Sequence, residues 1–73
     1  MIRKEALRNK IRELGYTYRE QQKRTHLYKN SKTSHYISLP MRDLVTEQYV
    51  GFTLRDAGCS KEEIEAFIAS AKS

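Results

Sequence analysis

Cysteine is almost absent from the chain, with Cys59 as its only example. A single cysteine cannot form a disulfide within the chain, so we expect the protein in a reducing, cytoplasmic compartment. No other cysteine or histidine stands at metal-ligand spacing from Cys59, and we expect no metal site there. We interpret Cys59 as a small half-buried residue between two helices rather than as a reactive thiol.

Long apolar runs are also lacking. The most apolar stretch extends from Leu44 to Phe52 and contains Glu47. It is too short and too polar to cross a bilayer, and the N-terminus lacks the apolar segment of a signal peptide. We therefore expect a soluble protein with neither a membrane anchor nor a signal peptide.

Glycine is scarce and isolated, at Gly15, Gly51 and Gly58. The chain therefore has no glycine-rich phosphate loop, no dinucleotide-binding fingerprint and no nucleophile elbow. We expect no cofactor.

What is present is enough for one small folded domain. The 73 residues are 38% hydrophobic and 32% charged, which is too apolar for a disordered tail. We expect residues 1–73 to form a single domain. A chain of this length buries only about 60% of its unfolded surface, so its stability is marginal and assembly with a partner is plausible.

Charge is divided unevenly along the chain. Residues 1–42 carry eleven basic and three acidic side chains, a net charge of +8, whereas residues 43–73 carry three basic and six acidic ones, a net charge of −3. A basic surface at one end suits a partner that carries phosphates, and we expect that partner to be RNA. The alternative is an ordinary solvated surface that happens to be basic.

Hydrophobic periodicity predicts three helices and three strands. In chain order these are a helix over 2–14, strands over 16–21, 25–29 and 34–39, a helix over 47–57 and a helix that follows a capping box at Ser60. Gly15 and Gly58 end the first two helices, and Pro40 ends the third strand. The predicted fold is α+β, in the order α-β-β-β-α-α, with a three-stranded antiparallel sheet and the helices on one face.

Alternation along the strands predicts which side chains face the helices. The third strand is expected to turn His35 and Ile37 inward, with His35 as a core or rim histidine. The second strand is expected to turn Leu27 inward, so that His26 and Tyr28 point outward.

The segment from Gln21 to Lys29 alternates cations with hydroxyl groups and contains a histidine. This composition fits cleavage of a phosphodiester, because a neutral imidazole can accept the proton of a ribose 2′-hydroxyl while neighbouring cations stabilise the phosphate. Such chemistry needs no metal. His26 is the candidate general base. The candidate RNA contacts are Lys23, Arg24, Thr25, Tyr28 and Lys29.

Structural roles are the alternatives for the same residues. His26 can be a strand residue that makes one hydrogen bond to a neighbour. Tyr28 and Tyr36 can stack on bases, but tyrosine on a half-exposed sheet more often packs against its neighbours.

The order of these motifs resembles the HicA family of toxins, small bacterial mRNA interferases with a double-stranded-RNA-binding-domain-like fold. The matching segments are the Leu14-Gly15-Tyr16 junction, the run from Gln21 to Lys29 against Arg-Gln-Lys-Gly-Ser-His-x-x-Tyr, the Leu39-Pro40 strand end and the segment from Tyr49 to Ser60. The resemblance implies that His26 is the catalytic histidine and that a HicB-type antitoxin covers the histidine-bearing face.

The chain departs from the family pattern at two points. Arg24-Thr25 stands where the family has Gly-Ser; the threonine hydroxyl can replace that of serine, and Arg24 can contact phosphate instead. The interval from Gly15 to His26 is longer by about two residues, which implies an insertion or a bulge.

Two other functions fit the same sequence. One is a non-catalytic RNA-binding module of the same fold, and the other is a protein-interaction domain whose basic face meets an acidic partner.

Overall fold

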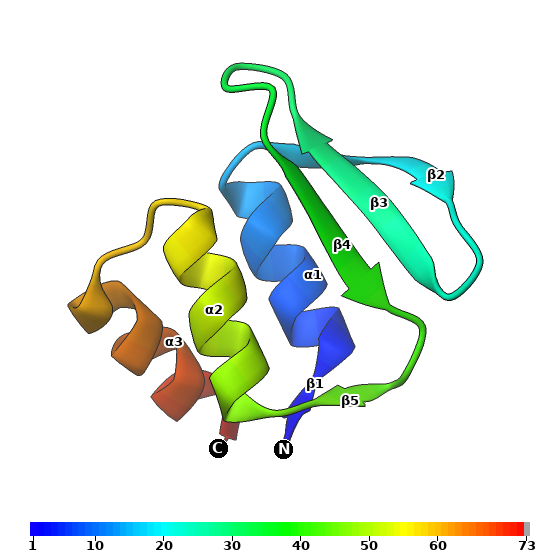
Figure 1. Ribbon diagram of the computed structural model, residues 1–73. Coiled ribbons are helices and arrows are strands. Elements are labelled where there is room, and N and C mark those ends of the chain that lie inside the picture. The colour runs from blue at the N-terminus through cyan, green and yellow to red at the C-terminus, as the bar shows by residue number, and fades with distance from the viewer. Residues whose placement is uncertain (73) are drawn as a thin grey trace.

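The computed structural model describes residues 1–72 and shows three helices beside a three-stranded sheet (Figure 1). The elements are β1 (Ile2–Arg3), α1 (Lys4–Glu13), β2 (Tyr16–Gln21), β3 (Thr25–Asn30), β4 (Tyr36–Pro40), β5 (Leu44–Val45), α2 (Glu47–Asp56) and α3 (Lys61–Lys72). The sheet is antiparallel in the order β2-β3-β4, which confirms the predicted α+β fold class. Across residues 1–72, no helix is both long and apolar enough to traverse a bilayer.

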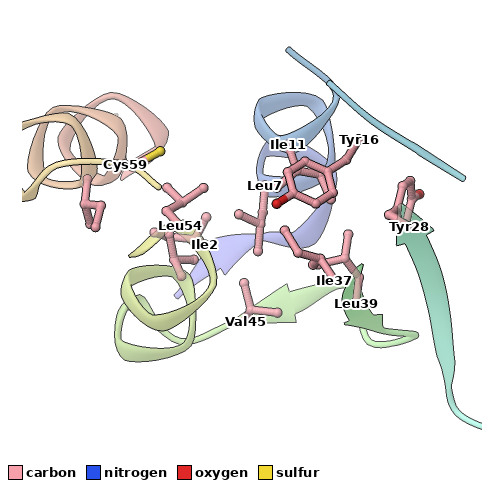
Figure 2. Close-up of a cluster of buried hydrophobic side chains, with 12 residues drawn as sticks. Ile2, Leu7, Ile11, Tyr16, Tyr28, Ile37, Leu39, Val45, Leu54 and Cys59 are labelled. Atoms are coloured by element: carbon pink, nitrogen blue, oxygen red, sulfur yellow. The ribbon is translucent and has the colours of Figure 1, made fainter. Parts of the chain in front are cut away.

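The helices lie on one side of the sheet, with α1 nearest to it and α2 between α1 and α3 (Figure 1). The core fills the space between α1, α2 and the inner sheet face (Figure 2). Its buried hydrophobic residues are Ile2, Leu7, Ile11, Tyr16, Tyr28, Ile37, Leu39, Val45, Val50, Leu54, Cys59 and Ile64.

The first helix begins later than the sequence predicts, because Ile2 and Arg3 form a strand. They pair antiparallel with Val45 and Leu44, and the fully buried Ile2 side chain joins the core. The Lys4 N–H then donates to the Asp43 carbonyl (2.8 Å), which ties the start of α1 to the β4–β5 connection. Strands of two residues are too short to produce a period-two pattern, so the sequence does not indicate them.

Asn30 holds the junction between α1 and β2 against the β3–β4 turn. Its Nδ2 donates to the Leu14 carbonyl (3.2 Å), and its Oδ1 accepts from the N–H groups of Lys32 (2.9 Å) and Thr33 (3.3 Å). Gly15 has a φ of 103°, so the predicted left-handed end of the helix is confirmed. A Cβ on Gly15 would lie 3.3 Å from the Asn30 Nδ2, so both conformation and space favour glycine here.

The predicted capping box at the start of α3 is confirmed. The Ser60 N–H donates to the Glu63 carboxylate (2.7 Å), and the Glu63 N–H donates to the Ser60 hydroxyl (3.2 Å). Gly58 has a φ of 95° after α2. Cys59 follows as a buried link between the two helices, and burial raises the pKa of its thiol, which favours the packing role over a reactive one.

The predicted orientation of β3 is wrong. Tyr28 is only 4% exposed and lies in the core, where it pairs across the sheet with Ile37 (Figure 2). Leu27 is half-buried on the opposite face, beside Ser38. The larger tyrosine ring buries more area than leucine would, and the alternation of the strand then turns His26 toward the helices as well.

Each edge of the sheet has a distinct local structure. In β2 the pairing shifts between Tyr18 and Glu20, which leaves Arg19 as an extra residue opposite β3 and agrees with the expected bulge. On the far edge, the Tyr49 hydroxyl of α2 donates to the Ser38 carbonyl of β4 (2.6 Å).

Candidate nucleic-acid interface

His26 is the second residue of β3 and lies half-buried near the end of the sheet where the β2–β3 loop joins it. It stands opposite Gln21 of β2 and Leu39 of β4. Its ring meets the edge of Tyr18, with 5.6 Å between centroids and 83° between the planes. Tyr18 is 54% exposed and is itself in edge contact with the buried Tyr28 (5.8 Å), so the imidazole packs against an aromatic pair.

The imidazole lies in a groove between β3 and helix α1, and two arginines of that helix line the same groove. Arg8 and Arg12 are four residues apart, so they stand on the same side of α1. The groove has a volume of about 510 Å³ and is lined by Arg8, Arg12, Thr17, Tyr18, His26 and Tyr28. We name it the histidine groove.

Sequence reasoning did not single out the two arginines. The signal that would have found them is their position one residue after the core residues Leu7 and Ile11, which places Arg8 and Arg12 beside the buried stripe. This position indicates a shared site only if His26 is assigned to the face of β3 that packs against the helices. With His26 assigned to the outer face, α1 and the histidine lie on opposite sides of the sheet.

The histidine groove is electropositive and its cations lack internal partners. Within the described part of the chain, neither Arg8 nor Arg12 forms an ion pair. The Nε of Arg8 is buried and has no hydrogen-bond partner among residues 1–72. The rest of the guanidinium group lines the groove, where it can pair with an anion.

The predicted RNA contacts are distributed over three places. Lys23 and Arg24 are exposed in the loop between β2 and β3, and Thr25 begins β3. Lys29 points to the outer face, where its Nζ lies 5.5 Å from the centroid of the Tyr36 ring. The loop that carries Lys23 and Arg24 therefore joins the sheet next to His26, whereas the side chains of Thr25 and Lys29 lie on the opposite face of the sheet from the imidazole.

The structure does not place Tyr28 where it could stack on a base. Its ring is buried in the core, so it is not accessible for stacking on a base. The supporting role remains, because Tyr28 holds Tyr18 against the imidazole.

His35 occupies the predicted rim position. Its Nδ1 is 2.6 Å from the hydroxyl of the buried Tyr16, and the two rings are in edge contact. Desolvation by burial, followed by the charges of Asp56 and Cys59, raises the pKa of Tyr16. His35 is therefore a satisfied structural histidine, as expected.

No group of three or more possible metal ligands occurs among the described residues. The chain matches no family model, no curated protein and no solved structure. The likeness to HicA toxins, with its implied antitoxin partner, therefore remains a prediction from the motifs alone.

Proposed function

We propose that the chain is a metal-independent endoribonuclease of the toxin type, with His26 as general base. The observation that carries the proposal is the histidine groove, in which one imidazole shares a cavity with the guanidinium groups of Arg8 and Arg12. A base and two cations around one cavity are the groups that cleavage of a phosphodiester by its own 2′-hydroxyl requires.

The reaction proceeds by proton transfer from the ribose 2′-hydroxyl to the imidazole of His26. The 2′-oxygen then forms a bond to the adjacent phosphorus, and the bond from phosphorus to the 5′-oxygen breaks. The products are a 2′,3′-cyclic phosphate and a 5′-hydroxyl, which takes its proton from water. Because the nucleophile belongs to the substrate, no metal-bound water is needed to supply it.

The arginines stabilise the negative charge that develops on the phosphate in the transition state. Arg8 is the better fixed of the two, because it is half-buried, and its guanidinium group would donate to a phosphate oxygen in the groove. Arg12 is exposed at the rim, where it can follow the strand of RNA. Tyr18 restricts rotation of the imidazole by its edge contact.

The remaining predicted contacts extend this site along the RNA. Lys23 and Arg24 add positive charge in the loop next to His26, and Thr25 supplies a hydroxyl on the opposite face of the sheet. Lys29 lies on the other face and would bind phosphate only if the RNA reached the outer surface. A HicB-like antitoxin, in this proposal, would inhibit the enzyme by covering the histidine groove.

The test is cleavage of labelled single-stranded RNA by the purified chain in buffer with a chelator. His26→Ala should lower the single-turnover rate by about 10²–10⁴-fold with little change in affinity, because the base is lost and the cations remain. It should also abolish growth arrest on expression. RNA with 2′-O-methyl groups should not be cleaved, since its nucleophile is blocked.

Arg12→Ala tests the role of the cations, with Lys10→Ala as the matched control. Both changes remove one positive charge from α1, but Lys10 lines a different groove, against α3. Arg12→Ala should lower the cleavage rate and Lys10→Ala should not. A folded His26→Ala protein as active as the parent would rule out the proposal. Binding without cleavage by the parent would leave the RNA-binding module as the function.

A further inference from the structure

A second groove lies where β3 begins and β4 ends. These strand ends are at the same end of the sheet as the β2–β3 loop (Figure 1). It has a volume of about 550 Å³ and is lined by Arg24, Thr25, Pro40, Met41 and Arg42. We name it the Met41 groove. The Thr25 and Pro40 pair that forms its base is the rung next to the pair of His26 and Leu39.

The Met41 groove presents an apolar surface between two cations. Met41 is 45% exposed, although it is a large hydrophobic side chain, and it adjoins the ring of Pro40. Arg24 and Arg42 reach the groove from separate loops, and neither forms an ion pair with a described residue. The neighbouring acid, Asp43, lines another groove.

We propose that the Met41 groove is a subsite for a nucleotide of single-stranded RNA that flanks the reactive one. The base packs on Met41 and Pro40, and the phosphates on either side of it pair with Arg24 and Arg42. The inference rests on the RNA partner in the proposed function. A nucleotide suits the groove because its base can pack on an apolar surface while the phosphates on either side of it pair with cations.

The position of the groove selects single strands over duplexes. Thr25 and His26 are consecutive residues of β3, so their side chains point to opposite faces of the sheet. An RNA that fills both grooves must therefore bend around the β2–β3 loop, where Lys23 is exposed. A flexible single strand can make this bend, whereas a stiff duplex cannot without a large deformation energy.

The experiment measures binding of a fluorescent single-stranded RNA of about ten nucleotides. All variants are made in the His26→Ala chain, so that the RNA stays intact. Met41→Ala should weaken binding about three- to tenfold through lost apolar contact. Arg42→Ala should also weaken binding, and it should reduce the slope of log affinity against log salt by about 0.7. A duplex of equal length should bind at least about tenfold more weakly than the single strand.

Two exposed residues of α2 supply the controls. Phe52→Ala removes an exposed apolar side chain and Arg55→Ala an exposed cation, both outside the Met41 groove. Neither control should change affinity beyond twofold, a difference of about 0.4 kcal/mol. Equal effects of groove and control variants would overturn the subsite, as would a duplex that binds as well as the single strand.

Cleavage by the parent chain separates failure of the subsite from failure of the proposed function. If the parent cleaves RNA and Met41→Ala and Arg42→Ala bind normally, the subsite is wrong and the enzyme stands. If both variants lose affinity and the parent does not cleave, the subsite stands and the catalytic role is wrong. If the parent binds no RNA, both are overturned.

Discussion

Asn30 connects three parts of the chain through one side chain. It is 7% exposed, and its side chain forms hydrogen bonds with Leu14 at the end of α1 and with Lys32 and Thr33 in the β3–β4 turn. An amide can do this because its donor and its acceptor are separate atoms that point in different directions, whereas an ionised carboxylate has no proton to donate. Asn30 therefore fixes the position of β3 relative to α1, and the histidine groove lies between those two elements.

Asn30→Ala should destabilise the domain by about 1–3 kcal/mol. The change removes three partly buried hydrogen bonds, and a hydrogen bond contributes about 0.5–1.5 kcal/mol to stability. Urea denaturation measures the loss, with the exposed neighbour variant Ser31→Ala as control. If the two variants are equally stable, Asn30 does not organise the junction.

Among single residues, the sequence drew attention to His26, which lines the histidine groove, but did not predict which side chains surround it. The face of β3 depends on whether Leu27 or Tyr28 enters the core, and both are large and apolar enough to do so. Cross-strand pairing with Ile37 decides it for Tyr28, and that pairing is not encoded within β3 itself. His26 faces α1 because Tyr28, and not Leu27, enters the core.

Among the helices, α3 has the most complete N-terminal cap. The Ser60 N–H, which donates to the Glu63 carboxylate, lowers the pKa of Glu63 most, and the Ser60 side chain and the charge of Lys10 in α1 act in the same direction. A carboxyl group with a lowered pKa stabilises the fold above its ordinary pKa, and this contribution is lost as pH falls through the lowered value. The cap is therefore an acid-sensitive part of the domain.

Glu63→Gln should remove this part of the acid sensitivity. Glutamine keeps an oxygen that accepts from the Ser60 N–H, but it does not titrate. Thermal unfolding at pH values from about 6 to 3 should show the parent losing its advantage over the variant as pH falls. Glu65→Gln on the same helix changes the same charge outside the cap and should leave the pH profile unchanged. Parallel profiles for the parent and Glu63→Gln would contradict the assignment.

The helices and the three long strands were predictable because each extends over enough residues to show a period. Their ends were predictable where residue chemistry determines them, as at Gly15, Gly58 and Ser60. The pair of β1 and β5 was not predictable, since two residues show no period and their pairing joins segments about forty residues apart. Ile2 was recognised as apolar but was assigned to the wrong element.

For the whole molecule, the dominant property is the division of charge. The basic half supplies α1, β2, β3 and β4, whereas most of the acidic residues belong to α2 and α3. Both proposed RNA grooves lie within the basic half, where each contains two arginines. A polyanion should therefore be attracted to the sheet end of the domain and not to the outer helices.

RNA affinity should fall steeply with salt, with a slope of about −0.7 for each phosphate contact on a single strand. Lys23→Glu should reduce that slope, since Lys23 stands at the loop between the two grooves. Lys61→Glu makes the same change of charge at the start of α3 and should leave the slope unaltered. Fluorescence anisotropy over a series of salt concentrations measures both. A flat dependence in the parent would contradict any role with nucleic acid.

The hydrogen bond from Tyr49 to Ser38 limits the size of the sheet. The Asn30 N–H donates to the His35 carbonyl, so alternate residues of β4 bond to β3 and Ser38 turns its carbonyl outward. A strand from another chain would have to displace the phenol to pair there, and on the opposite edge it would meet the bulge at Arg19. Although β4 carries no charged side chain to repel a neighbour, both edges of the three-stranded sheet therefore disfavour pairing with a strand of a second copy.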